Sequence, residues 1–245
     1  MEVHAHSHTH GKKNWKAYFW EFLMLFLAVF CGFLAEYQLE HKIESDREKV
    51  YVKNLYEDLR SDTVIYAAYK SSGIEFAKHI DSLIRLLKSP DRNAHLDKIY
   101  FYTRVLTINS NIVYPNQRTF TQMKNSGLLR LISKQKVAEN VSSYYLSLDE
   151  ILSQNNFILN MISDYWQEVG NIFDAEVLYR IRIDRKVPDN KSLKLMTNDP
   201  VVINKFLVNA QYLFGSRTKQ SEAIAQMLQR AKVLMLLISE EYHLK

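Results

Sequence analysis

The most hydrophobic stretch of the chain lies near its amino terminus, where residues 22–35 read FLMLFLAVFCGFLA without a charged or strongly polar side chain. At 1.5 Å per residue this stretch is about 21 Å long, which is less than the ~30 Å hydrocarbon core of a bilayer. A helix that begins at Trp15 reaches about 31 Å. Lys16, near its start, can extend its ammonium group to the interface. The pattern therefore predicts a transmembrane helix over residues 15–35.

Two other interpretations of this helix stay open: a cleaved signal peptide and a buried helix of a soluble core. Signal-peptide cleavage requires small residues at two positions just before the cut. Phe33 before Ala35 and Phe30 before Gly32 do not meet that requirement. Phe30 also precedes Cys31, where a lipoprotein site needs a small residue. The flanking residues therefore favour the membrane anchor.

The charges around the apolar stretch indicate an orientation. Lys12, Lys13 and Lys16 lie on its amino-terminal side, whereas the first basic residue on the other side is Lys42, after two glutamates. By the positive-inside rule the short tail is cytoplasmic and residues 36–245 are exported. Several basic residues soon follow Lys42, and they weaken this bias.

Beyond the anchor, apolar residues recur three or four positions apart, which is typical of amphipathic helices. The predicted helices occupy residues 36–87, 96–106, 115–123, 134–177, 200–214 and 219–242. Such spacing gives each helix an apolar stripe along one face, and these stripes are buried against one another in a helical bundle. The expected fold class is all-α, with an N-terminal transmembrane helix followed by an antiparallel bundle of long helices. The expected domains are a disordered His-rich cytoplasmic tail at 1–14, the membrane helix at 15–35 and a helical extramembrane domain at 36–245.

Glycine and proline are scarce, with 6 Gly and 4 Pro in 245 residues. This shortage argues against turn-rich β folds and glycine-rich phosphate cradles. The four prolines all fall between predicted helices or at the first residue of one, and Gly127 suits the left-handed position after a short helix. We expect the long helices to bend or end at Gly73 and Gly170, and a break at Gly215 to separate the last two helices.

Charge and motifs exclude several function classes. The net charge is +5, but the 32 basic and 27 acidic residues are interleaved, so no basic patch indicates nucleic-acid binding. The single cysteine cannot form an intramolecular disulfide. No nucleophile, phosphate-binding or metalloprotease motif is present. We therefore expect no enzymatic activity, no catalytic residue, no cofactor and no small-molecule substrate.

The tail HAHSHTH places four histidines, His4, His6, His8 and His10, at alternate positions. In an extended chain all four imidazoles lie on one side, where two or three of them can chelate Zn²⁺, Ni²⁺ or Cu²⁺. No carboxylate or cysteine completes the shell, and a flexible tail loses entropy on binding. The favoured interpretation is a solvated tail without a metal.

Two other groups of residues can form a binding site, but a structural role is the simpler explanation for each. Asp58 and Asp62 lie one helical turn apart, where a carboxylate pair can bind a cation or share a proton. The favoured interpretation is a solvated face. Aromatic residues on the 134–177 stripe can line a ligand pocket, although packing is the favoured role. They are Tyr144, Tyr145, Tyr165 and Trp166.

Three segments carry a resemblance to a family of uncharacterised single-pass membrane proteins of Bacteroidetes-type bacteria. They read KKNWKAYFWEFLMLFLAVFCGFLAEYQLEH, LYEDLRSDT and TFTQMKNSGLLRLI, and two tyrosines follow the last. The resemblance implies a membrane location, a bacterial origin and a native His-containing tail, and it implies no catalytic residue. Together with the orientation above, it predicts a bacterial inner membrane with residues 36–245 in the periplasm.

The expected function is that of a membrane-anchored, non-enzymatic structural or protein-interaction module. Its partners are the lipid bilayer and either further copies of the chain or another membrane protein. One alternative is an exported domain that senses a ligand or partner and relays to another membrane protein. A third possibility is an enzyme whose site is assembled from distant carboxylates and histidines.

Overall fold

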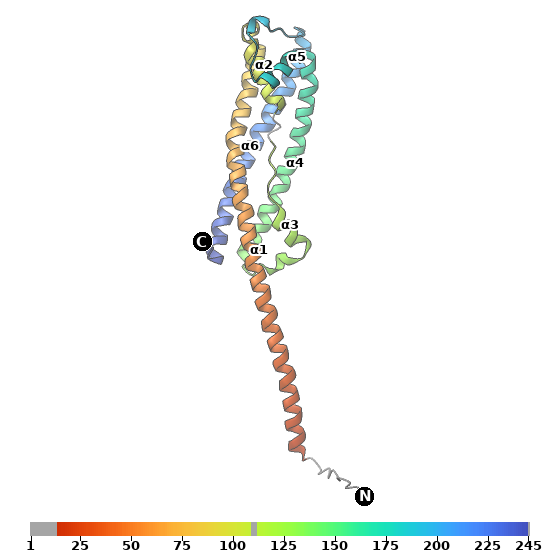
Figure 1. Cartoon of the computed structure of the whole chain (residues 1–245), viewed down its shortest axis with the longest axis vertical. Helices are drawn as coiled ribbons and strands as arrows, with labels where there is room; N and C mark the ends of the chain where they lie inside the picture. The colour runs from red at the N-terminus through yellow and green to blue at the C-terminus, as the bar shows by residue number, and fades with distance from the viewer. Residues whose placement is uncertain (1–13, 109–111, 245) are drawn as a thin grey trace, which may run out of the picture. The chain divides into compact units, whose positions relative to one another are not determined.

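The computed structural model describes residues 14–108 and 112–244, and it contains no strand within them. This confirms the predicted all-α class (Figure 1). The α-helices are α1 (Trp15–Lys88), α2 (Leu96–Ile108), α3 (Arg118–Asn125), α4 (Gln135–Ile172), α5 (Ala175–Asp184) and α6 (Pro200–Tyr242). Short 3-10 helices lie at η1 (Arg92–His95), η2 (Leu128–Leu131) and η3 (Asn190–Ser192).

The chain divides into two units, Met1–Val50 and Tyr51–Lys245, and helix α1 contributes to both. In the first unit α1 carries the apolar stretch 22–35, and none of the side chains there is buried. In the described part of the chain, α1 is the one helix long and apolar enough to cross a membrane. Signal sequences and core helices can share that length and composition. In α1, however, the most apolar segment of 18 residues is 0% buried.

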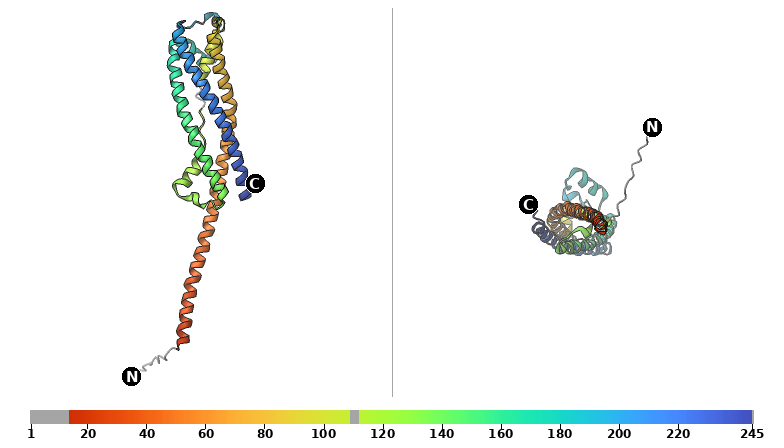
Figure 2. Two further views of the ribbon diagram at one scale, coloured as in Figure 1. Left: turned by 180° about the vertical axis from the view of Figure 1, so that it is seen from behind. Right: turned by 90° about the horizontal axis from the view of Figure 1, so that it is seen from below.

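The second unit is a bundle of long helices formed by α4, α6 and the part of α1 that follows Val50 (Figures 1 and 2). Helix α1 and helix α4 run in the same direction, and α6 runs antiparallel to both. Helix α2 and residues 112–117 lead back along the bundle to α3, which is why α1 and α4 can be parallel neighbours. Helix α5 packs against α2.

Buried residues recur every three or four positions on each long helix, as the hydrophobic pattern predicts. They form two hydrophobic clusters along the bundle. One cluster joins Phe76–Leu87 of α1 to α2, α5, the end of α4 and the start of α6. The other joins Val52–Tyr69 to α3, the start of α4 and the end of α6. Between them the buried stripes carry Asn155, Arg217 and Gln220.

The predicted bend or end at Gly73 is wrong as a helix end, because α1 continues through Ser71–Gly73 to Lys88. Gly73 is buried, and a Cβ atom there would lie 2.7 Å from Ser221 Oγ of α6. The missing side chain therefore allows α1 and α6 to approach closely. Gly73 is a packing residue rather than a helix end.

The predicted helix 134–177 is wrong at its carboxyl end, because two helices occupy that segment. Helix α4 ends at Ile172, two residues after Gly170, and Phe173 has an extended backbone. Asp174 then caps α5, and its carboxylate accepts hydrogen bonds from the Glu176 and Val177 N–H groups. Such a cap stabilises a new helix start by about 1 kcal/mol.

The predicted break at Gly215 is also wrong, because α6 is continuous from Pro200 to Tyr242. Glycine costs a helix only about 1 kcal/mol, and the apolar stripes on both sides of Gly215 are buried. The predicted start of α6 is confirmed, with Asp199 as the N-cap and Pro200 in the first turn. Helix α3 begins at Arg118, three residues after the predicted Pro115. Gly127 has the expected left-handed φ of 70°.

Candidate functional site

Asp58 and Asp62 are buried in the bundle, with relative exposures of 1% and 0%. The favoured interpretation of a solvated face is therefore wrong for both carboxylates. Arg60, between them in sequence, is exposed and pairs with Glu57 at 3.3 Å. Asp62 falls in register with the buried stripe of α1, between Leu59 and Tyr66. This register is the sequence signal that distinguishes a buried aspartate from a solvated one.

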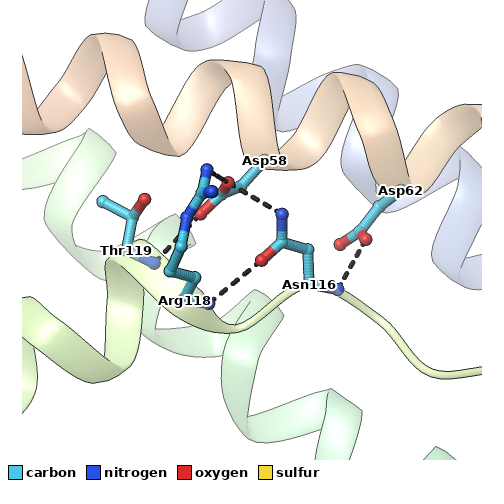
Figure 3. Close-up of polar contacts among 5 residues, drawn as sticks. All are labelled: Asp58, Asp62, Asn116, Arg118 and Thr119. Carbon is cyan, nitrogen blue, oxygen red and sulfur yellow. Dashed lines mark hydrogen bonds and ion pairs between the residues drawn. The ribbon is translucent and has the colours of Figure 1, made fainter.

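The two aspartates bind the segment that leads into α3 (Figure 3). Asp58 Oδ1 accepts hydrogen bonds from Asn116 Nδ2 at 2.8 Å and Arg118 Nη2 at 2.9 Å, and its Oδ2 accepts the Thr119 N–H at 3.0 Å. Asp62 Oδ1 accepts the Asn116 N–H at 2.7 Å. We call these five residues, Asp58, Asp62, Asn116, Arg118 and Thr119, the carboxylate junction.

The junction supplies a hydrogen-bond acceptor for the first turn of α3, which has none from its own N-cap residue. The first N–H groups of a helix have no partner inside the helix, and they attract negative charge. The N-cap residue Gln117 makes no side-chain capping bond. Asp58, which belongs to α1, instead accepts the Thr119 N–H in the first turn of α3. A helix of eight residues is not stable alone in water, so the junction holds α3 in place.

A chain of hydroxyl groups extends from the junction into the bundle. Tyr144 Oη of α4 donates to Asp62 Oδ2 at 2.9 Å, and it also lies 3.1 Å from Tyr66 Oη of α1. Burial is the main cause that raises the pKa of Asp62 to about 6, and the Asp58 charge acts in the same direction. The hydrogen bonds from Asn116 and Tyr144 oppose this rise. Burial also raises the pKa of both tyrosines.

Three of the four candidate aromatic residues are buried, as their favoured packing role requires. Tyr144 belongs to the hydroxyl chain, and Tyr165 packs on Phe206 with ring centroids 5.1 Å apart. Tyr145 stacks on Phe120 at 4.1 Å. Its hydroxyl is buried and has no hydrogen-bond partner among the described residues. Trp166 differs from the other three because it is exposed at the surface.

A second polar group lies between the two hydrophobic clusters, and sequence reasoning missed it. Gln220 Oε1 accepts hydrogen bonds from Tyr69 Oη and from Arg217 Nη1, the latter at 3.1 Å. Gln220 Nε2 donates to Asn155 Oδ1 at 2.7 Å, and Asn155 Nδ2 donates to the Val113 carbonyl at 2.6 Å. We call Tyr69, Asn155, Arg217 and Gln220 the polar layer. It joins α1, α4, α6 and residue 113.

The Arg217 guanidinium of the polar layer also lies over an aromatic ring. The Arg217 guanidinium carbon lies 4.8 Å from the centroid of the Phe76 ring. Burial lowers the pKa of Arg217, whereas its interactions with Tyr69 raise it. Buried polar groups of this kind fix the register of packed helices, because any other register separates them from their partners.

The described residues 14–108 and 112–244 contain no group of three or more His, Cys, Asp or Glu side chains placed to hold a metal ion. The candidates His4, His6, His8 and His10 lie outside the described residues, so the solvated tail without a metal stays a prediction, with metal binding as its alternative. Elsewhere, His79 lies 3.9 Å from Glu75 on the same helix.

A polar groove runs over the outer face of α4 and α6. It has a volume of about 160 Å³, and Arg230 donates to Ser147 across it. Exposed apolar side chains lie beside the groove on both helices: Leu146, Phe157 and Val233.

The comparisons with known proteins add no identification. No family model matches the chain, and neither a curated protein nor a solved structure matches it. The functional argument therefore rests on the apolar stretch of α1, the junction, the polar layer and the groove.

Proposed function

We propose that the chain is a single-pass, membrane-anchored helical protein whose extramembrane domain is a non-enzymatic structural or protein-interaction module. The observation that carries the proposal is the uncovered apolar stretch of α1, where no side chain from residue 22 to residue 35 is buried. Water disfavours a continuous apolar surface of this size, and a bilayer core removes that cost.

The residues at the ends of the stretch support the same proposal. Trp15, Tyr18 and Trp20 are exposed at one end, and Tyr37 is exposed at the other. Aromatic residues of this kind favour the membrane–water interface. A helix from Trp15 to Tyr37 is about 34 Å long, which fits a hydrocarbon core of ~30 Å with a modest tilt.

The orientation and compartment belong to the proposal. The lysines before residue 17 support a cytoplasmic location of the short tail by the positive-inside rule. With the bacterial origin that the family resemblance implies, we infer that the membrane is the bacterial inner membrane and that the exported domain lies in the periplasm.

The packing of the polar residues supports a non-enzymatic role. Both carboxylates of the junction accept hydrogen bonds from donors that hold α3 and its preceding loop. The amides of the polar layer bond to one another across helices. These bonds account for the buried polar residues as parts of the framework. The outer groove of α4 and α6, with its apolar margins, is the surface we assign to a protein partner or a second copy.

Cysteine cross-linking in native membranes tests the interaction role. After Cys31→Ser removes the single thiol, Leu146→Cys places a new one beside the groove, and Val64→Cys places a control on the exposed surface of α1. A bifunctional thiol or thiol-to-amine reagent should give a discrete larger species for the Leu146→Cys chain and much less of it for the control. A chain that stays monomeric at both positions at native expression contradicts the proposal.

The sensing alternative is favoured by one observation, the buried Asp62 carboxyl at the end of a hydroxyl chain. Such a group responds to the pH of the solution, and from α1 it contacts two other parts of the bundle, Asn116 and Tyr144 of α4.

A further inference from the structure

The two buried carboxylates of the junction have different surroundings. Asp58 faces a cation, Arg118, and two further donors. Asp62 receives hydrogen bonds from two neutral donors, the Asn116 N–H and the Tyr144 hydroxyl. The junction therefore holds two carboxylates, one turn apart, against one cation. A buried negative charge without a cation of its own is costly, and a proton removes that cost.

We propose that Asp62 is a proton-binding site, and that its protonation fastens residues 112–127 more tightly to α1. The geometry allows the proton to enter without loss of a hydrogen bond. When Asp62 is ionised, Tyr144 donates to Oδ2 and accepts from Tyr66. When Oδ2 carries a proton taken from water, it donates to Tyr144 Oη, and Tyr144 donates to Tyr66 Oη. Asp62 Oδ1 accepts the Asn116 N–H in both states.

The titratable groups that interact with Asp62 come from two helices. Asp58 and Tyr66 belong to α1, and Tyr144 and Tyr145 belong to α4. The nearby cation of the junction is Arg118 of α3. Arg118 bonds to Asp58, and its own side chain is 77% exposed, so water screens its charge. The buried Tyr145 hydroxyl, which the charges of Asp62 and Asp58 influence, makes no hydrogen bond to either carboxylate. These surroundings therefore favour the neutral form of Asp62 more than water does.

The direction of the pH effect follows from the pKa of Asp62 in the two states. It is about 6 when the segment is attached, and it returns toward the ordinary 3.8 when release of the segment exposes Asp62 to water. The attached state therefore binds the proton more tightly. Its advantage is complete below pH 3.8 and is lost as the pH rises through 6. Between about pH 7.5 and about pH 5, the attachment equilibrium should strengthen about tenfold.

Amide hydrogen exchange on the full chain in detergent micelles tests the proposal. The probes are peptides that contain the Asn116 and Thr119 N–H groups, which donate to the two carboxylates. Protection is compared with the intrinsic exchange rate at each pH. The protection factor of these peptides should rise about tenfold from about pH 7.5 to about pH 5. Peptides from the cluster around Phe206 should rise less, because local release does not expose them.

Three variants separate this proposal from a general effect of acid. Asp62→Asn cannot take up the proton and should abolish the rise, whereas Asp81→Asn changes an exposed carboxylate paired with Arg85 and should preserve it. Tyr144→Phe removes a donor that lowers the pKa of Asp62, so it should move the midpoint of the rise to higher pH. The Tyr144→Phe shift keeps the test valid if Asp62→Asn does not fold. An equal rise in Asp62→Asn, or weaker protection of the wild type at low pH, overturns the proposal.

Discussion

Replacing Asp58 with alanine is expected to lower the free energy of unfolding of the bundle by about 3 kcal/mol. The change removes the acceptor of the Thr119 N–H and of the Asn116 side-chain amide. The Thr119 residue is buried, so water replaces the lost acceptor poorly. Arg118 adds little to the cost, because its exposed side chain is hydrated once the carboxylate is gone. The thermal midpoint should fall by roughly 6–12 °C for a domain of this size.

Asp81→Ala is the matched control for this prediction. Asp81 also lies on α1 and forms an ion pair, with Arg85 at 2.8 Å, but its side chain is 43% exposed. Exposed pairs of this kind contribute about 0.5 kcal/mol or less. Denaturant unfolding of both variants measures the contrast. Equal losses for Asp58→Ala and Asp81→Ala would show that the junction does not hold α3 as described.

Gln220→Ala is expected to cost about 3–4 kcal/mol, because it removes an amide that bonds to three buried side chains and leaves a cavity. Gln220 accepts from Tyr69 and Arg217 and donates to Asn155. The loss should appear in the denaturation midpoint. It should also appear as faster exchange in peptides near residue 113, whose carbonyl accepts the Asn155 amide.

Gln226→Ala provides the control for the polar layer on the same helix. Gln226 is exposed and lines the outer groove. Its replacement should change the free energy of unfolding by about 0.5 kcal/mol or less. If Gln220→Ala were as mild as Gln226→Ala, the polar layer would contribute nothing to the packing of α1, α4 and α6.

The helices could be predicted from the sequence because the recurrence of apolar residues every three or four positions is a local property of the chain. The stripe Leu55, Leu59, Tyr66 and Tyr69 identified the buried face of α1 without knowledge of its neighbours. Helix ends were harder to predict. Asp174 ends one long stripe and starts another helix, whereas Gly215 interrupts a stripe without ending the helix. Tertiary packing decides between these outcomes, and the local sequence does not contain it.

The junction shows the same limit at a polar site. The spacing of Asp58 and Asp62 placed them on one face of a helix, and that part of the prediction is confirmed. Their burial depends on Asn116, a residue 54 positions beyond Asp62 that reaches them through the returning chain. The register of Asp62 with the apolar stripe was the available signal. The partner of a buried carboxylate cannot be read from its own helix.

A fusion of alkaline phosphatase after residue 245 tests the central claim, a membrane anchor followed by an exported bundle. The enzyme is active only when it is exported, and fractionation shows whether the fusion stays with the membrane. The account predicts active phosphatase in the membrane pellet. Active phosphatase in the soluble fraction would indicate a cleaved signal peptide, and inactive phosphatase in the soluble fraction would indicate a buried core helix. Inactive phosphatase in the membrane pellet would contradict the proposed orientation.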